Sequence, residues 1–252
     1  MSEKKAKVKS IHSGHRERIK NKYLRFGCEN FENHELLELI LYYASPRKDT
    51  NELAHTLLNR FGSLHAVFQA SISELETIPG IGKNAAILIH LFSETFRAIE
   101  YDKNKKMKFL NSVHELGIYL RPYFLGRTNE QVVLLCLDGK KKVLSCGSIF
   151  EGSFNSAQIS IKRVAELAVS TKATFVVIAH NHPSGFAVPS EQDIETTEKL
   201  QKALAGIGVI LLDHLVFGDD DYISFADSGY IRLSSDLYQY YNVSDSGPTR
   251  NI

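Results

Sequence analysis

The sequence has few cysteines, and their placement excludes a fold held together by disulfides. Its 252 residues contain three, Cys28, Cys136 and Cys146, an odd number with no C-x-x-C pair. Paired cysteines at regular spacing are typical of small secreted domains, whereas isolated ones are typical of proteins kept in a reducing compartment. The cysteine pattern therefore predicts a cytoplasmic protein.

Long apolar runs are also missing. No stretch of the sequence approaches the roughly 20 apolar residues that a membrane-spanning helix needs. The first ten residues, MSEKKAKVKS, are basic, but no apolar segment of the secretory type follows them. We therefore expect no secretory signal and no membrane partner.

Three common catalytic motifs are absent: H-E-x-x-H, G-x-S-x-G and a Walker-type phosphate loop. Their absence excludes the protease, hydrolase and nucleotidase classes built on them. The net charge of +1 hides an asymmetry, because basic residues outnumber acidic ones in residues 1–110 and the reverse holds in residues 111–252. The first part could therefore attract a polyanion weakly, although so small an excess is also typical of an ordinary surface.

Residues 16–100 have the apolar spacing of helices. The stretch NHELLELILYYAS predicts a helix with Asn33 as its N-cap. Further along, SISELETIPGIGKNAAILIHLFSETFRAIE predicts a short helix, a glycine hairpin and a longer helix ending near Glu100. The pattern predicts one all-helical domain over residues 15–101, preceded by a basic flexible tail, 1–14.

A change of pattern follows the charged stretch 102–110, which predicts a linker. Beyond it, apolar strand-like runs such as EQVVLLCL and TFVVIAH alternate with amphipathic helices. Strands separated by helices are typical of an α/β sandwich, here over residues 111–235 with a C-terminal tail, 236–252. The predicted fold class is therefore α+β, a helical domain followed by an α/β sandwich.

The hairpin IPGIGK, residues 78–83, places two glycines between two helices. Gly80 and Gly82 permit backbone conformations in which amides approach a phosphate closely, and a helix beginning near Lys83 adds a favourable dipole. The hairpin resembles a helix-hairpin-helix motif, whose amides contact nucleic-acid phosphates without reading sequence. It predicts weak, non-specific, salt-sensitive DNA binding; the alternative is that the hairpin only joins two helices.

A histidine pair ends the second buried run, in AHNHPSGFAVPSEQD. His180 and His182 point to one face of a strand because side chains alternate with period two, and Asp193 follows in the first turn of the next helix. Two histidines and one aspartate leave a fourth position for water, which is typical of a catalytic zinc site. The alternative is a polar surface pair, with Ser190 as N-cap and Asp193 as an acidic residue suited to the helix dipole.

These residues resemble a known family. The spacing H-x-H, seven residues, Ser, two residues, Asp is that of the JAMM (MPN-type) metalloproteases, and His180, His182, Ser190 and Asp193 match it without gaps. The fuller string, with LLDHLVFGDDDYISFADSGYI downstream, is similar to the RadC branch of that superfamily. RadC-like proteins also carry a helical N-terminal domain with a hairpin, so the resemblance covers most of the chain.

The resemblance implies a zinc-dependent hydrolase that cleaves an amide or isopeptide bond in a peptide or isopeptide-linked substrate. It implies that His180, His182 and Asp193 bind Zn²⁺ and that Ser190 supports the oxyanion. Zinc makes water a nucleophile at neutral pH. A nearby carboxylate then moves the proton to the leaving amine.

In JAMM enzymes that carboxylate is a glutamate opening the strand after the first helix of the domain. Glu130, at the head of EQVVLLCLDG, occupies the matching place, and Glu151 in FEGS is the alternative because it also lies near a strand end. His214 matches the family string and is interpreted as a structural or supporting residue. RadC-like sequences carry Pro-Arg-Glu where this chain has residues 161–163, Ile-Lys-Arg. If that glutamate were the catalytic one, this chain would bind zinc without being active.

A second function, of another class, follows from the same resemblance. The RadC name is associated with DNA repair, and the hairpin supplies a candidate DNA contact. In that case the chain is a DNA-associated genome-maintenance factor whose metal site is structural or vestigial. A metal-dependent cleavage activity favours the hydrolase, and salt-dependent binding to nicked or branched DNA favours the repair factor.

Overall fold

The structure is a computed structural model that describes residues 14–46, 49–152, 160–219 and 221–233. The chain divides into two compact units between Thr95 and Phe96, within a single long helix. The tails predicted at residues 1–14 and 236–252 lie outside the described residues, apart from Gly14. Among the described residues, no helix combines the length and the apolar character needed to cross a bilayer.

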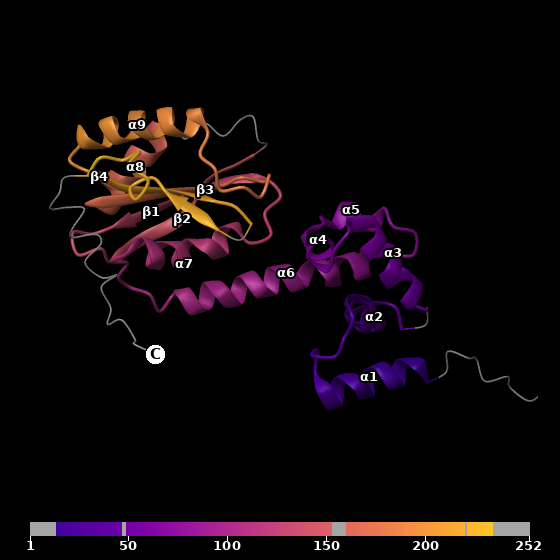
Figure 1. Ribbon diagram of the computed structural model, residues 1–252. Helices are drawn as coiled ribbons and strands as arrows, with labels where there is room; N and C mark the ends of the chain where they lie inside the picture. Colours follow the sequence, from indigo (N-terminus) through magenta and orange to yellow (C-terminus); the bar gives the residue numbers. More distant parts are fainter. Residues whose placement is uncertain (1–13, 47–48, 153–159, 220, 234–252) are drawn as a thin grey trace, which may run out of the picture. The chain divides into compact units, whose positions relative to one another are not determined.

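The N-terminal region is helical, as predicted (Figure 1). Its helices are α1 (His15–Phe26), α2 (Asn33–Ala44), α3 (Asn51–Phe61), α4 (Leu64–Gln69), α5 (Ile72–Glu76) and α6 (Lys83–Asn104). Apolar residues spaced three and four apart on α2, α3 and α6 meet in one core. Its fully buried members are Leu37, Leu41, Ala54, Leu57, Val67, Leu75, Ala86 and Ile89.

The start of α2 differs from the prediction. Its N-cap is Glu32, not Asn33, because Glu32 has extended backbone angles whereas Asn33 is already helical. The amide of Glu32 donates to Glu35 Oε2 at 3.0 Å, which is one half of a capping box. Helix α3 ends at Gly62, which has the left-handed conformation common at helix ends.

The long helix α6 continues past the predicted end near Glu100 to Asn104. Asn104 is buried, and its Nδ2 donates to the carbonyl of Ile118 at 2.8 Å. This contact holds the last turn of α6 against the helix that follows, so the first residues of the segment predicted as a linker are helical. Phe109, further along that segment, forms an isolated β-bridge with Lys142.

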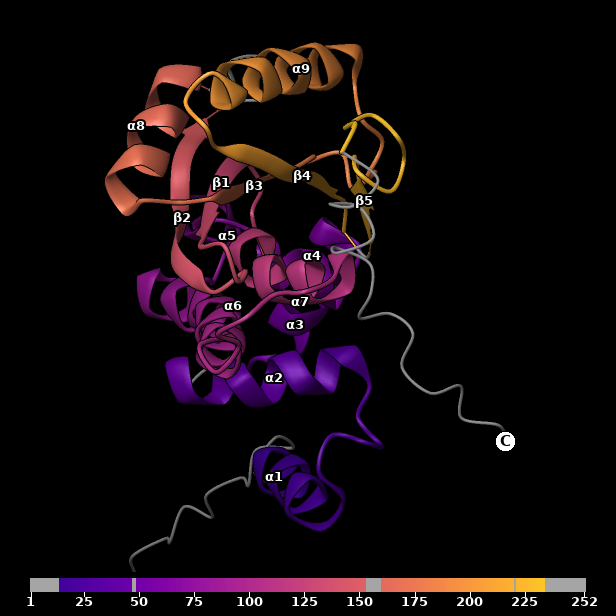
Figure 2. The same cartoon turned by 90° about the vertical axis from the view of Figure 1, so that its left-hand side faces the viewer.

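The C-terminal unit contains one five-stranded sheet in the order β2-β1-β3-β4-β5. The strands are β1 (Glu130–Leu137), β2 (Val143–Gly152), β3 (Phe175–Asn181), β4 (Ile210–Phe217) and β5 (Tyr222–Ser224). The central pair β3 and β4 is parallel, and the other neighbours are antiparallel. Helix α7 (Val113–Phe124) covers one face, and α8 (Ile161–Thr171) and α9 (Glu191–Ala205) cover the other (Figures 1 and 2).

Two cores lie on the two faces of this sheet. The α7 side takes Val133, Leu135, Leu137, Val177 and Ala179, whereas the α8 and α9 side takes Val132, Leu134, Cys136, Val176 and Ile178. Alternate residues of one strand thus enter opposite cores, and all eight residues of β1 are buried. The predicted α+β class, a helical domain followed by an α/β sandwich, is confirmed.

Candidate metal centre

The histidine pair lies where β3 meets the loop that leads to α9. Strand β3 ends at Asn181, so it contains His180 but not His182, whereas the prediction placed both histidines on the strand. The amide of His182 nevertheless donates to the carbonyl of Phe217 at 2.9 Å. This bond continues the ladder between β3 and β4 by one residue. His180 is buried, and the side chain of His182 is only 12% exposed.

A close backbone contact shapes the loop after His182. The amide of Gly185 donates to the carbonyl of His182 at 3.0 Å, which closes a tight turn. A Cβ on Gly218, at the end of β4, would lie 2.5 Å from the carbonyl oxygen of Gly185 and 2.8 Å from the amide of Ala187. Only glycine permits this approach, so Gly218 allows the loop to bring His182 and α9 together.

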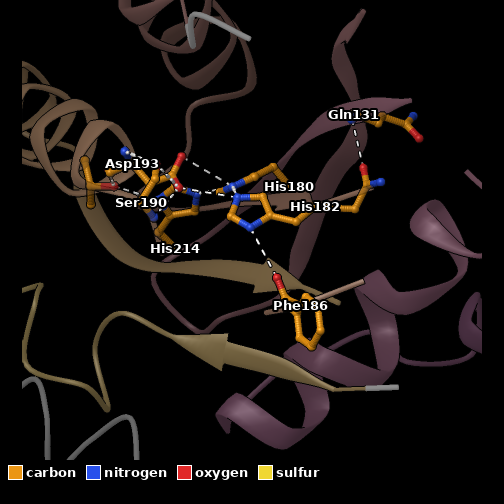
Figure 3. Close-up of polar contacts among 9 residues, drawn as sticks. Gln131, His180, His182, Phe186, Ser190, Asp193 and His214 are labelled. Carbon is orange, nitrogen blue, oxygen red and sulfur yellow. Dashed lines mark hydrogen bonds and ion pairs between the residues drawn. The ribbon is translucent and has the colours of Figure 1, made fainter. Parts of the chain in front are cut away.

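Three potential ligands converge from these elements (Figure 3). Nε2 of His180 lies 2.9 Å from Nε2 of His182 and 3.4 Å from Oδ1 of Asp193. Nε2 of His182 lies 3.4 Å from Oδ2 of Asp193. Zinc bonds of about 2.0–2.1 Å at tetrahedral angles place ligand atoms about 3.3 Å apart. The separations of the two histidines from Asp193, which run to its two different oxygens, match this value, and the histidine pair is somewhat closer.

The hydrogen bonds of His182 decide which of its ring nitrogens faces the other two predicted ligands. His182 Nδ1 faces the carbonyl oxygen of Phe186 at 3.3 Å, and a carbonyl can only accept, so Nδ1 carries the proton. Nε2 of His182 therefore faces His180 and Asp193. Hydrogen bonding with Asp193 raises the pKa of His182, so in the metal-free protein a proton on Nε2 can lie between these groups. A metal ion bound there would take the place of that proton.

The charges of the cluster follow from burial and from its contacts. Burial alone would raise the pKa of Asp193, but its close contacts with the rings of His180 and His182 and its hydrogen bonds with Ser190 outweigh burial and hold that pKa below its usual range. Burial lowers the pKa of His180. Asp193 as a carboxylate and His180 as a neutral imidazole thus already have the forms that a metal requires, whereas the raised pKa of His182 means that a metal must displace a proton from that ring.

Glu130 opens β1 on the same side of the sheet as this cluster. Cross-strand neighbours share a face, and Val132, two residues after Glu130, pairs with His180. Burial and, to a smaller extent, the negative charge of Asp193 together raise the pKa of Glu130 to about 7, against the lowering effect of His182. Glu130 is therefore close enough to the predicted ligands to interact with them electrostatically.

Glu151, the alternative to Glu130, lies on the other face. It pairs across the strands with Gln131, whose side chain points away from that of Glu130. Its carboxylate forms an ion pair with Arg127 at 3.3 Å and is 49% exposed. The geometry thus places Glu130, and not Glu151, on the face that carries His180.

Ser190 is the N-cap of α9, which was the alternative interpretation of this residue. Its Oγ donates to Oδ2 of Asp193 at 2.6 Å and accepts from the amide of Asp193 at 3.2 Å. The capping box and the metal cluster therefore coexist, because the same bonds that begin the helix also orient the Asp193 carboxylate. The hydroxyl proton of Ser190, predicted to serve an oxyanion, is directed at Asp193 in this arrangement.

Two residues that the sequence did not single out belong to the centre. Asn181, between the two histidines, is hydrogen-bonded to the backbone on both sides of Glu130. Thr197, one turn after Asp193 on α9, contacts Nδ1 of His214. Neither has a sequence signal, because their partners lie far away in the chain.

The remaining predicted residues lie elsewhere. Gly80, Gly82 and Lys83 belong to the helical unit, where they line a hollow of about 590 Å³ together with Ala44, Ser45, Pro46, Asn84 and Ala85. Arg163 is exposed in the first turn of α8, and its amide donates to Oγ of Ser160 at 3.3 Å.

Both parts of the chain match known families. Residues 110–230 match a family described as RadC-like JAB domain, and residues 11–87 match one described as UPF0758 N-terminal. Among curated proteins, the chain is 33% identical over 225 residues to a UPF0758 protein of Fusobacterium nucleatum, covering 86% of this chain and 97% of that protein. It is 34% identical over 216 residues to the UPF0758 protein YsxA of Bacillus subtilis, covering 86% and 94%.

A third relative, a UPF0758 protein of Shewanella loihica, is 36% identical over 212 residues, covering 84% of this chain and 94% of that protein. These matches run through the helical domain and the sheet domain in the same order. They confirm the resemblance to RadC-like proteins that the histidine motif suggested. The chain belongs to the UPF0758 family, with a RadC-like JAB domain behind its N-terminal helical domain.

Proposed function

We propose that this chain is a zinc-dependent hydrolase of the JAMM type that cleaves an amide or isopeptide bond. The observation that carries this proposal is the convergence of His180, His182 and Asp193 on one point, with Glu130 on the same face of the sheet. A cluster of two imidazoles and a carboxylate, little exposed to solvent and beside a carboxyl group of raised pKa, is the arrangement that metal-assisted hydrolysis needs.

The donor set fits zinc. Two imidazoles and one carboxylate are typical of catalytic zinc sites, whereas magnesium and calcium prefer oxygen ligands alone. His180, His182 and Asp193 would hold the ion and leave a fourth position open. When bound, zinc supplies a Lewis acid that polarises a carbonyl and makes water a nucleophile near neutral pH.

Glu130 would move the proton. A pKa of about 7 means that both its carboxyl and its carboxylate form are populated near neutral pH. Such a group can take a proton from the attacking water and return it to the leaving amine. Ser190 would contribute to the oxyanion only after its hydroxyl turns away from Asp193, to which it now donates.

A substrate-profiling screen tests this proposal. Purified, zinc-loaded protein is incubated with a library of peptides and isopeptide-linked conjugates, and cleavage is followed by mass spectrometry. We expect cleavage that a chelator abolishes, that added zinc restores, and that Asp193→Asn lacks. Cleavage that survives chelation, or that Asp193→Asn retains, would contradict the proposal.

We also propose that the helical domain contacts nucleic-acid phosphates, because its hairpin lies beside a hollow at the N-terminus of α6. The hollow beside the hairpin is lined by Gly80, Gly82, Lys83 and Asn84, where α6 begins. The first amides of a helix have no acceptor within the helix, and the helix dipole favours an anion there. Ile78 and Ile81 are buried and anchor the hairpin in the core.

The salt dependence of DNA binding by the full chain tests this second proposal. The hairpin is tested through Lys83 because Gly80 has a φ of +98°, so a larger residue there would strain the fold. At Gly82 a Cβ meets nothing within 4 Å, so a substitution there would block little. Lys83→Glu should weaken binding and reduce its salt dependence, and the exposed Lys106→Glu is a control of equal charge change. Equal loss in both variants would indicate general electrostatic attraction without a hairpin site.

A further inference from the structure

A continuous chain of buried contacts runs from α9 to the predicted ligand His180. Oγ1 of Thr197 lies 2.6 Å from the carbonyl oxygen of Asp193 and 2.6 Å from Nδ1 of His214. Nε2 of His214 lies 2.8 Å from Nδ1 of His180. The exposed fractions of Thr197, His214 and His180 are 2%, 0% and 1%, so water competes for none of these contacts. Figure 3 shows His214 beside the cluster.

Thr197, on α9, sets the direction of each hydrogen bond in this series of contacts. A carbonyl oxygen can only accept, so the single hydroxyl proton of Thr197 points to the carbonyl of Asp193. Its oxygen must then accept from His214, which places a proton on Nδ1 of that ring. The reverse arrangement would set two acceptor oxygens 2.6 Å apart with no proton between them, and acceptors at that distance repel.

The proton on Nδ1 of His214 decides the state of its other nitrogen. His214 is fully buried, and its ring nitrogens contact a hydroxyl and an imidazole, not a carboxylate, so a second proton would create a buried cation without a direct partner. Nε2 of His214 therefore has a lone pair and accepts from Nδ1–H of His180. With its proton on Nδ1, neutral His180 presents a lone pair at Nε2, toward His182 and Asp193.

We propose that Thr197 and His214 are positioning residues that hold His180 in the one tautomer that can ligate a metal through Nε2. This inference deepens the proposed function and rests on its metal site. Ligating histidines commonly donate their second N–H to a carboxylate or a carbonyl, groups that can only accept. Here the acceptor is another histidine, His214, whose ring could carry its proton on either nitrogen. Thr197 is therefore needed to keep that proton on Nδ1 of His214.

The same helix thus serves two ligands. Asp193 and Thr197 lie one turn apart on α9, so α9 supplies one ligand directly and sets the tautomer of a second through His214. His214 itself is held from the other side, since its amide donates to Oδ1 of Asp213 at 2.7 Å and its ring packs against that of Phe225.

Ring-nitrogen NMR of the metal-free protein and zinc affinity test this inference without any substrate. Protonated and lone-pair ring nitrogens differ in ¹⁵N chemical shift, so the spectrum reports each tautomer directly. At about pH 8, where an unperturbed histidine is neutral, we expect His180 and His214 both to carry their proton on Nδ1. A wild-type His180 with its proton on Nε2 would overturn the inference, regardless of the zinc affinity that is measured.

Variants separate positioning from folding. Thr197→Val removes the hydroxyl at nearly constant volume, and His214→Phe removes the acceptor; each should raise the zinc dissociation constant about 10- to 100-fold. Thr197→Ser keeps the hydroxyl and should restore wild-type affinity. Leu204→Val trims a buried residue of α9 that takes no part in the contacts between Thr197, His214 and His180, so it should lower stability while leaving zinc affinity unchanged.

Two results of this comparison would contradict the inference. One is wild-type zinc affinity in Thr197→Val and His214→Phe, and the other is a loss in Leu204→Val as large as theirs. Failure of the proposed function is a separate result, since a wild type that binds zinc but cleaves no substrate would leave the tautomer and affinity measurements intact.

Discussion

Asn181 holds the backbone on both sides of Glu130. Its Oδ1 accepts from the amide of Gln131 at 2.8 Å, and its Nδ2 donates to the carbonyl of Asn129 at 3.1 Å. The backbone pairing of β1 with β3 ends at Val132 and His180. Beyond that pair, the side chain of Asn181 makes the hydrogen bonds to the β1 backbone that a further pair of strand residues would make. The residue between the two predicted histidine ligands thereby positions the predicted proton carrier.

We expect Asn181→Ala to lower the free energy of unfolding by about 1–3 kcal/mol, because it leaves a buried amide and a carbonyl without partners. Amide hydrogen exchange at Gln131 should accelerate at the same time. Urea unfolding and exchange measurements check both effects. Gln131→Met is a matched control: Gln131 is buried and its Oε1 has no partner, so its removal should cost little. Unchanged exchange at Gln131 in Asn181→Ala would contradict this account of Glu130.

Glu130 and Asp193 should differ in what their substitution removes. Glu130→Gln should keep zinc and lower turnover of a cleaved substrate by about 10²–10⁴-fold, because only the proton carrier is lost. Asp193→Asn should lose both zinc and activity, since it removes a ligand. Glu151→Gln, on the other face of the sheet, should do neither. Loss of turnover in Glu151→Gln with normal turnover in Glu130→Gln would reverse the assignment of the base.

The raised pKa of Glu130 predicts a pH-dependent stability of the metal-free protein. Its pKa is about 7 in the folded state, and the pKa of glutamate is about 4.3 in an unfolded chain. Between these values the folded state binds more protons than the unfolded state, so this carboxyl lowers stability as pH rises through the interval.

Glu130→Gln removes this penalty. The metal-free variant should match the wild type below about pH 4 and exceed it in stability above about pH 7. The expected gain is about 1–2 kcal/mol, reduced from the full shift because solvent partly screens the carboxylate. Urea unfolding across this pH range measures the difference. A difference that does not change with pH would show that Glu130 titrates normally.

Gly218 should be essential for the position of His182. Gly218→Ala places a Cβ 2.5 Å from the carbonyl oxygen of Gly185, so the loop after His182 must move away. We expect zinc affinity to fall about tenfold or more, as it does when the support of a metal ligand is disturbed. Gly147→Ala in β2 is the control, because a Cβ there meets nothing within 4 Å. Competition with a zinc chelator gives both affinities.

Much of this architecture could be predicted from local patterns. Apolar periodicity separates the helical unit from the sheet unit, and the capping rule places Ser190 and Asp193 at the start of α9. The spacing of His180, His182 and Asp193, with its family resemblance, was enough to predict that they meet. These features depend on residues close in sequence, or on a motif of fixed length.

The rest depends on strand register, which local patterns do not determine. Glu130 and Glu151 both lie near strand ends, and only the pairing of Gln131 with Glu151 shows that they occupy opposite faces. The contact between Asn181 and Gln131 joins residues 50 positions apart, and the contact between Thr197 and His214 joins residues 17 apart. Sequence reasoning could therefore predict that the three candidate ligands meet, but not which residues hold them in place.

Zinc content combined with X-ray absorption is the most direct measurement of the central claim, that His180, His182 and Asp193 form a metal site. Purified wild type loaded with zinc and dialysed should hold about one ion per chain, with nitrogen and oxygen ligands at about 2.0–2.1 Å. Glu130→Gln should give the same spectrum, and Asp193→Asn should hold no zinc. A wild type without zinc, or an Asp193→Asn variant that binds it with the same ligand shell, would contradict the site described here.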